Sequence, residues 1–433
     1  MNPKIKVVGG GLAGAEAAYQ LLKRGYAVDM YEMRPNKTTP AHKTAGLAEL
    51  VCSNSLKSLD VGTAQGALKE EMKLLDSIVL KCAMIAKVPA GGALAVDREI
   101  FSQEIEKILN SFDNFNVIRE EVVEIEDDMI VATGPLTSDT LTQKIIEVTG
   151  SESLKFYDAV APIISASSVD MSIAFKSARY GKGDPDYINC PMNKEEYYDF
   201  VKELTNAETV ILKEFEKGDV FEACMPVEVM AKRGEDTLRF GPLRPVGIYD
   251  ENGKRAYAVV QLRKEDNYDN LVNLVGFQTN LTFPEQKRVF TMIPGLKDAE
   301  FVRYGVMHRN TYINSPSCLN ENFTIKNRKN LYFAGQLTGV EGYLESAMSG
   351  ILAGINMACA IEGKDAFIPP EDTLSGSLVR YVTGMIGEFQ PMHVSFALLP
   401  PLEEKIKNKS ERKLAYAKRA INSMKNYILE RGE

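Results

Sequence analysis

The fold of this chain is decided by residues 5–14, which read Ile5-Lys6-Val7-Val8-Gly9-Gly10-Gly11-Leu12-Ala13-Gly14. A short apolar run of strand type leads directly into G-x-G-x-x-G, and helical sequence follows from Ala15 to Lys23. In such a turn the first glycine permits the tight bend, the second lets a pyrophosphate approach the backbone, and the third lets helix and strand pack closely. The free N–H groups of the helix N-terminus attract phosphates. The stretch therefore predicts a dinucleotide-binding turn, with cofactor contacts from Gly9, Gly10, Gly11, Leu12, Ala13 and Gly14.

A second strand, Ala27-Val28-Asp29-Met30-Tyr31, follows this helix and ends at Glu32. An acidic residue at this distance from the glycines is typical of a carboxylate that accepts hydrogen bonds from ribose hydroxyls. We therefore expect Glu32 to bind a ribose of the dinucleotide. The alternative is a glycine-rich turn that serves only helix packing.

Two later segments favour FAD over NAD as the resident dinucleotide. A short apolar strand from Met129 ends in Ala132-Thr133-Gly134, and another from Leu331 ends in Ala334-Gly335-Gln336. A helical run from Tyr343 to Glu362 follows, with small residues at Ala347, Gly350, Ala353 and Gly354. This layout resembles the two-part FAD fold of the glutathione-reductase type, in which a late strand and helix return to the flavin. Gly134, Gly335 and Gln336 are then further cofactor contacts, and a transient NAD(P)H site remains open.

The region between these two parts changes character. Turn signals separate short strand-like runs from about residue 165 to about residue 300, and the clearest strands are Tyr257–Leu262 and Leu271–Val275. We predict an α/β fold of the glutathione-reductase type, a two-part FAD-binding Rossmann fold with an inserted α+β domain. The predicted FAD-binding domain comprises residues 1–165 and 300–433, and the insertion domain comprises residues 166–299.

Composition is that of a globular protein without a membrane span or a metal site. The chain has 433 residues, 45% hydrophobic and 25% charged, and no run approaches the ~18 apolar residues of a membrane helix. The N-terminus enters its first strand at once, which leaves no room for a signal peptide. Six cysteines are scattered without a C-x-x-C pair. We therefore expect a cytoplasmic protein in a reducing compartment, with no zinc.

The C-terminal segment is expected to form a basic helix. Helical spacing relates Leu414, Ala417, Ile421, Met424 and Ile428, so these residues predict one buried face. The other faces are basic although the whole chain carries a net charge of −8, and they present Lys405, Lys407, Lys409, Arg412, Lys413, Lys418, Arg419 and Lys425. One interpretation is a surface that contacts RNA phosphates, together with arginines of residues 230–310. The alternative is a solvated helix face.

Several longer motifs are specific enough to suggest a family. They are Ala48-Glu49-Leu50-Val51-Cys52-Ser53-Asn54-Ser55-Leu56-Lys57, Val88-Pro89-Ala90-Gly91-Gly92-Ala93-Leu94-Ala95-Val96-Asp97-Arg98, Phe221-Glu222-Ala223-Cys224-Met225-Pro226, Gly241-Pro242-Leu243-Arg244-Pro245-Val246-Gly247 and Arg303-Tyr304-Gly305-Val306-Met307-His308-Arg309-Asn310. Across nearly its whole length, the chain resembles the folate- and FAD-dependent tRNA uracil-5 methyltransferases (TrmFO, formerly Gid). It also resembles the GidA/MnmG tRNA-modifying flavoproteins at the glycine loop and at Ala334-Gly335-Gln336, although these carry a long extra C-terminal domain.

The resemblance implies an activity. Carbon 5 of the T-arm uridine of tRNA (position 54) is methylated with 5,10-methylenetetrahydrofolate as one-carbon donor and FAD as reductant, and NAD(P)H re-reduces the flavin. Because carbon 5 of uracil is a poor nucleophile, the reaction needs a thiolate that adds at carbon 6 and a base that removes the carbon 5 proton. By motif match Cys224 is the nucleophile candidate and Cys52 the base candidate. Tyr343 matches a tyrosine thought to stack on the flavin.

Other residues have weaker claims to a role in the site. Cys190 is an alternative substrate-site thiol, whereas Cys82, Cys318 and Cys359 are expected in the core, as free cysteines usually are. The nucleophile needs a positive neighbour, for which the nearest cations in sequence are Lys232, Arg233 and Arg239. His42 and His308 are possible folate or phosphate contacts, with a structural role as the alternative.

Alternative functions remain at this point. A paralogue could apply the same chemistry to a uridine of 23S ribosomal RNA, since these motifs serve the flavin and the thiols. A non-catalytic FAD-containing RNA-binding protein would need neither Cys52 nor Cys224. A flavin disulfide reductase would need a C-x-x-x-x-C pair near the glycine loop, which the sequence lacks. The FAD layout disfavours a SAM-dependent route, and the oligomeric state stays open.

Overall fold

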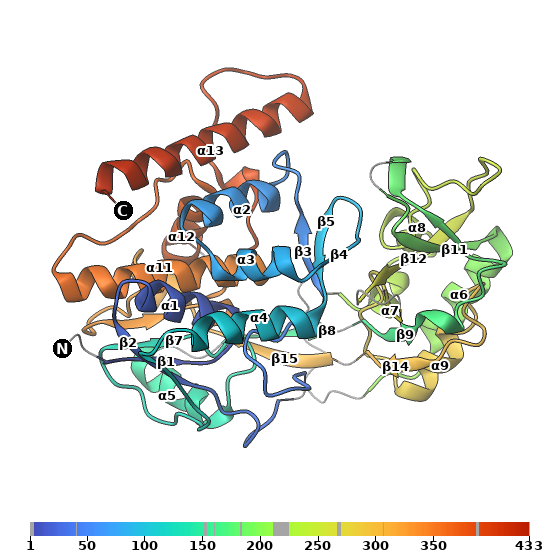
Figure 1. Ribbon diagram of the computed structural model, residues 1–433. Coiled ribbons are helices and arrows are strands. Elements are labelled where there is room, and N and C mark those ends of the chain that lie inside the picture. Colours follow the sequence, from blue (N-terminus) through green and yellow to red (C-terminus); the bar gives the residue numbers. More distant parts are fainter. Residues whose placement is uncertain are drawn as a thin grey trace.

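The computed structural model describes residues 4–39, 41–150, 154–159, 161–181, 184–210, 225–265, 270–305, 307–386 and 389–432. Figure 1 shows two lobes. One contains both chain ends and most of the helices, and the other is formed by the middle of the chain. Each lobe has its own cluster of buried hydrophobic residues, and the two clusters share no residue. We propose that these clusters correspond to the predicted FAD-binding and insertion domains.

The first lobe is built on a five-stranded sheet of order β16-β7-β1-β2-β6. All its neighbouring strands are parallel, and its members are β1 (Lys4–Val8), β2 (Ala27–Tyr31), β6 (Phe115–Ile118), β7 (Met129–Val131) and β16 (Leu331–Phe333). β16 pairs with β7 although some two hundred residues separate them, because the chain returns to this sheet after forming the second lobe. The predicted α/β class is confirmed, and so are the predicted strands at the glycine loop, before Glu32 and before Gly134 and Gly335.

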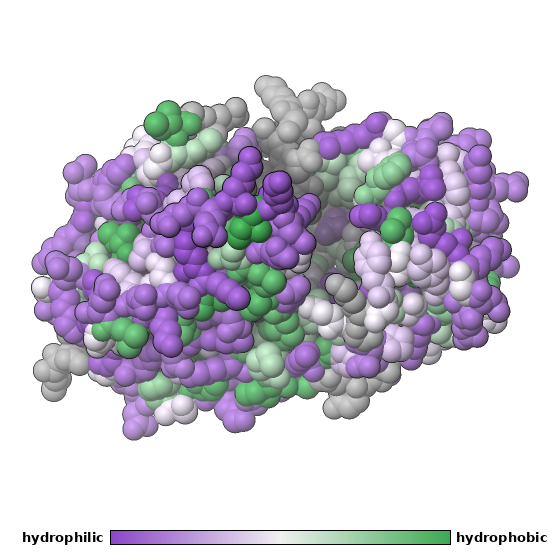
Figure 2. Space-filling model, turned by 90° about the horizontal axis from the view of Figure 1, so that it is seen from above, coloured by the Kyte–Doolittle hydropathy of each residue, from purple (hydrophilic) through white to green (hydrophobic). Residues whose placement is uncertain are grey.

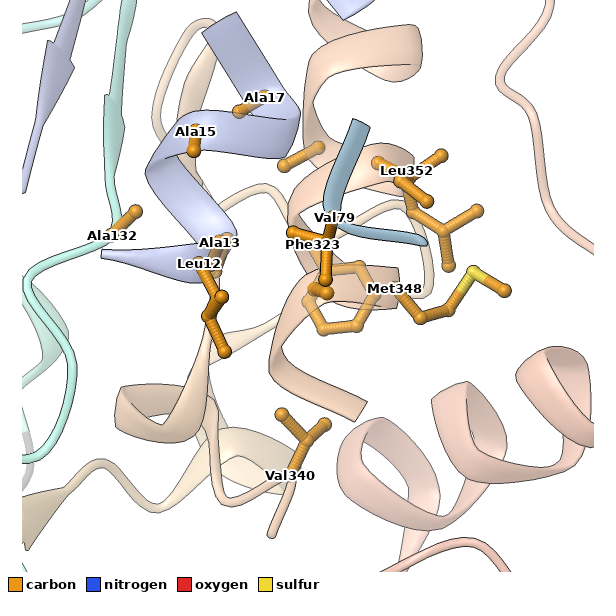
Figure 3. Packing of buried hydrophobic residues seen from close by; sticks show 14 of the residues in the cluster. Leu12, Ala13, Ala15, Ala17, Val79, Ala132, Phe323, Val340, Met348 and Leu352 are labelled. Carbon is orange, nitrogen blue, oxygen red and sulfur yellow. The ribbon is translucent and has the colours of Figure 1, made fainter. Parts of the chain in front are cut away.

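Helices cover both faces of this sheet (Figure 1). The helices of this lobe are α1 (Leu12–Leu22), α2 (Ala64–Leu74), α3 (Ile78–Ile85), α4 (Arg98–Asn110), α5 (Asp139–Thr149), α10 (Ser315–Cys318), α11 (Tyr343–Glu362), α12 (Leu374–Gly384) and α13 (Lys409–Arg431). α1 lies against α11, and Figure 3 shows Ala13 of α1 beside the helix that carries Met348 and Leu352.

The close packing of α1 on α11 depends on glycine. A Cβ on Gly350 would lie 2.1 Å from the carbonyl oxygen of Ala13, and one on Gly354 would lie 2.7 Å from that of Ala17. The small residues of α11 thus let the two backbones touch, which fixes the N-terminus of α11 next to the glycine loop. α11 has the length and apolar composition of a membrane-spanning helix, but 83% of its apolar window is buried inside the protein.

The second lobe contains a six-stranded sheet of order β10-β11-β12-β13-β9-β14. Its antiparallel strands are β9 (Ile163–Ser165), β10 (Phe175–Ser177), β11 (Tyr187–Met192), β12 (Ala258–Lys264), β13 (Leu271–Leu274) and β14 (Phe301–Arg303). The helices beside it in the described part of this lobe are α6 (Lys194–Asn206), α7 (Val227–Lys232), α8 (Thr237–Phe240) and α9 (Phe283–Phe290). The strands predicted around Val259 and Val272 are both confirmed.

Two smaller sheets lie where the lobes meet (Figure 1). β8 (Leu154–Ala159) pairs antiparallel with β15 (Met307–Tyr312), so the chain leaves and re-enters the first lobe along one ribbon. β3 (Ser55–Ser58), β4 (Lys87–Val88) and β5 (Ala93–Val96) form a three-stranded sheet. The stretch that carries Cys52 runs directly into β3.

The predicted C-terminal helix is confirmed as α13, but its predicted buried face is partly wrong. Ala417, Ala420 and Met424 are buried, whereas Leu414 is 38% exposed. Leu414 lies in the second turn of the helix, and the buried positions begin only at Ala417. Lys405 and Lys407 precede the helix rather than belong to it.

Candidate functional site

The glycine loop forms one wall of a deep pocket. Gly9 has φ 102°, and a Cβ there would lie 2.5 Å from the carbonyl oxygen of Ala132, so only glycine permits this turn. Gly14 does not line the pocket, since a Cβ there would lie 1.9 Å from the carbonyl oxygen of Gly9. A Cβ on Gly11 would meet no atom within 4 Å, because Gly11 faces the pocket. This open cradle before the N-terminus of α1 suits a pyrophosphate.

Glu32 also lines the pocket, and its carboxylate is bound by neighbouring groups. It accepts the backbone N–H of Gly10 at 2.9 Å and forms an ion pair with Arg34 at 2.9 Å. Burial acts to raise the pKa of Glu32, but hydrogen bonds and the charge of Arg34 outweigh burial and hold that pKa below its ordinary value. Glu32 is therefore ionised, and a ribose hydroxyl must share the carboxylate with Arg34.

The later segments complete the same pocket. Gly134, Gly335 and Gln336 all line it, although they follow strands far apart in sequence. The backbone N–H of Gly335 is held by the hydroxyl of Ser349 at 2.7 Å, which ties this loop to α11. His42 also lines the pocket, and its Nδ1 lies 2.6 Å from the hydroxyl oxygen of Thr39. The structure thus brings together around one pocket all the cofactor candidates named from the sequence except Gly14.

A thiol lies next to Tyr343 in the wall of the pocket. Tyr343 and Val51 line the pocket, and the sulfur of Cys52 lies 3.0 Å from the phenol oxygen of Tyr343. That oxygen accepts the backbone N–H groups of Cys52 at 2.9 Å and Ser53 at 3.2 Å. A phenol has two lone pairs and one hydrogen, so the hydrogen is left to point at the sulfur. Burial raises the pKa of Tyr343 well above its ordinary value, which keeps this donor protonated.

Comparison with known proteins places this pocket in a family. The family model described as "Glucose inhibited division protein A" matches residues 4–365. A protein of Lactobacillus gasseri is 54% identical over 435 residues, which cover 100% of this chain and 99% of that protein. A protein of Aquifex aeolicus is 53% identical, over 99% of this chain and 97% of its own length. Both bear the name methylenetetrahydrofolate--tRNA-(uracil-5-)-methyltransferase TrmFO.

The chain belongs to the TrmFO family. The predicted relation to GidA is also borne out by the family model and by structure. The solved structures of Aquifex aeolicus GidA match with TM-scores of 0.70 and 0.71 at 16% identity. They cover 98% and 99% of this chain and 73% and 76% of the GidA chain. At this low identity they show a shared fold only.

The cysteines of this TrmFO family member differ in burial. Among the cysteines that the structure describes, Cys52 alone is not buried. Cys190 is fully buried in the core of the second lobe, where burial raises its pKa to about 12. Cys82, Cys318 and Cys359 are also buried, as predicted. Cys190 is therefore not accessible to a substrate.

The nucleophile candidate Cys224 lies outside the described residues. The described residues begin again at Met225 and Pro226, immediately before α7. Of its three candidate cationic neighbours, Arg239 stacks over the ring of Tyr257 at 3.6 Å, while Lys232 and Arg233 lie exposed at the end of α7. His308 belongs to β15, whose backbone pairing is all that the structure describes there. No group of three or more metal-ligating side chains occurs in the described parts of the chain.

Three arginines near Cys52 escaped the sequence analysis. Arg98 donates to the carbonyl oxygen of Leu50 at 2.7 Å, Arg303 to that of Val51 at 2.9 Å, and Arg263 to the hydroxyl of Ser53 at 2.8 Å. A signal for two of them was present. Arg98 ends one of the TrmFO motifs and Arg303 begins another, but nothing in the sequence indicated that both reach the Cys52 motif.

Proposed function

We propose that this protein methylates carbon 5 of a uridine in tRNA, with 5,10-methylenetetrahydrofolate as one-carbon donor. Relatives that match 98–100% of the chain carry this activity in their name. The observation that carries the proposal is the Cys52 thiol held against Tyr343 at the rim of the dinucleotide pocket. A non-catalytic FAD-containing RNA-binding protein has no use for a thiol in this place.

The pocket fits FAD. The pyrophosphate cradle at Gly11, the ribose carboxylate of Glu32 and the loops at Gly134 and Gly335 would hold it, and Tyr343 would lie against its ring system. When bound, FAD supplies the reducing equivalents that convert the transferred one-carbon unit into a methyl group, and NAD(P)H renews them.

The protein side of the reaction falls to two thiols. The Cys224 thiolate adds to carbon 6 of the uracil, which turns carbon 5 into a nucleophile for the one-carbon unit. The Cys52 thiolate then takes the proton from carbon 5. The electron pair left on carbon 5 then expels the Cys224 thiolate from carbon 6, which restores the double bond between carbons 5 and 6. The phenol hydrogen of Tyr343 favours the thiolate form of Cys52, because a hydrogen bond donated to sulfur stabilises the charged state.

We propose the T-arm uridine at position 54 as the target and a basic surface on and before α13 as part of the RNA face. Figure 2 views the molecule from the side on which α13 lies, and shows hydrophilic side chains over that lobe and a hollow between the lobes. The exposed cations of this surface are Lys405, Lys407, Lys409, Arg412, Lys413, Lys418 and Lys425. Arg419 is not among them, since it donates to the carbonyl oxygens of Pro400 and Pro401.

Not every arginine of residues 230–310 is available to RNA. Arg263 and Arg303 point into the protein, and Arg288 is paired with Glu203 and Glu285. Arg244 and Arg255 are exposed. We therefore restrict the proposed contribution of the second lobe to exposed cations such as these two.

The test is a labelling experiment with separate RNA substrates. The holoenzyme is incubated with methylenetetrahydrofolate labelled in its one-carbon unit, NAD(P)H, and either a tRNA transcript, the same transcript with cytidine in place of the T-arm uridine, or a 23S ribosomal RNA transcript. We expect label as 5-methyluridine in the first RNA only. Label in the ribosomal RNA alone would establish the paralogue, and equal label in both tRNA transcripts would refute the T-arm target.

A further inference from the structure

Three guanidinium groups from three separate elements hold the backbone and side chains on both sides of Cys52. Before Cys52, Arg98 from the start of α4 binds the carbonyl oxygen of Leu50, and Arg303 from the end of β14 binds that of Val51. After Cys52, Arg263 from β12 binds the Ser53 hydroxyl at 2.8 Å and the Asn54 side-chain oxygen at 3.0 Å. We call these three side chains the arginine clamp.

The clamp joins the second lobe to the thiol. Arg263 and Arg303 belong to the six-stranded sheet, whereas Cys52 and Tyr343 belong to the first lobe. Asn54, which is fully buried, adds a further link because its amide nitrogen donates to the carbonyl oxygen of Lys264 at 2.9 Å. These hydrogen bonds directly couple the position of residues 50–54 to the position of the second lobe.

The clamp also places an excess of positive charge around residues 50–54, the segment that carries Cys52. Glu265 pairs with Arg98 at 2.8 Å, and it is the one carboxylate among the described residues that forms an ion pair with any of the three arginines. Glu49, the next acidic side chain toward this region, is already paired with Arg34 at 3.0 Å. The phenol of Tyr343, which contacts the sulfur of Cys52, is uncharged and adds no anion. Guanidinium groups stay protonated at neutral pH, so the clamp carries three positive charges and Glu265 supplies one negative charge.

Burial of these arginine side chains lowers the stability of the folded protein. Arg263 is 9% exposed and Arg303 has a buried Nε with no hydrogen-bond partner among the described residues. A buried cation that is not fully paired destabilises the folded state. Such a cost is common where a site needs a fixed charge, because a nearby cation favours the thiolate over the thiol.

We propose that Arg98, Arg263 and Arg303 are positioning residues that hold Cys52 against Tyr343 as a thiolate, and that the second lobe controls this thiol through Arg263 and Arg303. This proposal rests on the proposed function only in taking Cys52 to be the base in methyl transfer. The clamp and its effect on the thiol are testable without RNA or folate.

The experiment measures alkylation of Cys52 by iodoacetamide in the FAD-bound protein as a function of pH, with the Cys52 peptide quantified by mass spectrometry. Because the thiolate reacts and the thiol does not, the midpoint of the profile reports the charge state and its plateau reports access. The variants are Arg98→Met, Arg263→Met and Arg303→Met. The control is Arg328→Met, which also removes an ion-paired arginine. Arg328 is paired with Asp127 at 2.7 Å and lies next to the amino ends of β7 and β16, at the opposite end of the sheet from the glycine loop.

We expect each clamp variant to move the midpoint upward by about one pH unit, which is about a tenfold loss of thiolate below the midpoint. The control should keep the wild-type midpoint. An unchanged midpoint in all three clamp variants would overturn the proposal, even if methyl transfer is lost.

Lysine variants test the placement of Cys52 separately from the positive charge near it. They can also be used if a methionine variant fails to fold. Arg263→Lys keeps the positive charge. A single ammonium group, however, cannot reproduce the guanidinium geometry that binds Ser53 and Asn54 at the same time. We expect a near wild-type midpoint, with kcat lowered and the KM for RNA little changed. Wild-type kcat in Arg263→Lys would overturn the positioning role. Failure of the labelling experiment with wild-type protein, by contrast, would contradict the proposed function alone.

Discussion

The phenol oxygen of Tyr343 lies 3.0 Å from the sulfur of Cys52, although 291 positions separate the two residues. Cys52 lies in an irregular segment before β3, and Tyr343 is the first residue of α11. The two meet because α11 packs along α1, whose N-terminus faces the same pocket. One oxygen therefore connects the wall of the dinucleotide pocket to the thiol.

Replacement of Tyr343 by phenylalanine tests this connection. Tyr343→Phe removes the hydrogen bond to sulfur and leaves the N–H groups of Cys52 and Ser53 without their acceptor. We expect methyl transfer to fall by about tenfold or more, because unsatisfied donors cost about 1–3 kcal/mol. FAD should stay bound, since the ring is retained. The measurements are the initial rate of label transfer and the flavin-to-protein ratio.

Tyr332→Phe is the matched control. It also removes one buried tyrosine hydrogen bond, to the carbonyl oxygen of Asn356 at 3.0 Å, but it touches no thiol. Equal rates for the two phenylalanine variants would show that the Tyr343 hydroxyl has no special effect on the reaction.

A side chain at Gly11 should displace the cofactor without disturbing the fold. A Cβ there meets no protein atom within 4 Å and stands in the pocket. We therefore expect Gly11→Val to purify without flavin absorbance and with a wild-type circular dichroism spectrum. Gly384→Val is the control, because a Cβ at this exposed helix end also meets nothing within 4 Å. Yellow Gly11→Val protein with a full FAD content would contradict the cradle.

The two thiols should fail in different ways when replaced. Cys224→Ala should abolish methyl transfer and keep FAD, and the wild-type protein should form a covalent RNA adduct that survives denaturation and needs Cys224. Cys52→Ala should also cripple turnover, through loss of proton removal from carbon 5. Gel electrophoresis of the protein–RNA adduct and label transfer measure both effects.

Cys190→Ala controls for the general effect of losing a cysteine. Its sulfur is fully buried, so the expected result is a lower melting temperature with intact chemistry. Near-normal turnover by Cys224→Ala would remove it as the nucleophile, and the structure would then not offer Cys190 as a replacement.

Charge reversal on the basic surface tests the proposed RNA face. Changing four exposed lysines to glutamate should weaken RNA binding and flatten its salt dependence, because each lost phosphate contact removes about 0.7–0.9 from the log–log salt slope. These residues are Lys405, Lys407, Lys409 and Lys413. FAD content should not change, since the buried positions Ala417, Ala420 and Met424 are untouched.

The control for this prediction is the same change of net charge at other exposed lysines of the first lobe: Lys107, Lys326, Lys329 and Lys364. RNA affinity is measured against salt for both quadruple variants and for the wild type. Parallel lines for the two variants would mean that the segment before and within α13 is an ordinary solvated surface.

Much of the fold follows from local pattern. The strand at Val7, the strand before Glu32 and the long helix at Tyr343 agree with their predicted bounds to within a few residues. Each has a strong local signal, either an apolar run that ends in glycine or small residues at helical spacing. The buried face of α13 was predicted less well. Helical spacing marks Leu414 as equivalent to Ala417, but where burial begins depends on the elements packed against the helix, such as α2.

The residues of the site also fall into those that the sequence identified and those that only the structure revealed. The glycine loop, Glu32, Cys52 and Tyr343 were each recognisable in the sequence, because a turn, a strand end or a motif is written in adjacent residues. The arginine clamp was not, since Arg98, Arg263 and Arg303 lie on three elements of two sheets and gain a role only where those sheets meet. Likewise, the inaccessibility of Cys190 depends on the core that covers it.

The sequence by itself determined the dinucleotide fold, the two-part layout and the thiols of interest, because backbone conformation and family motifs are local properties of the chain. Only the tertiary structure decided which of those groups act together. Hydrogen bonds and charges exert their effects over a few ångströms, and the distance between Cys52, Tyr343 and the arginine clamp is set by the packing of α11 on α1 and of one lobe against the other.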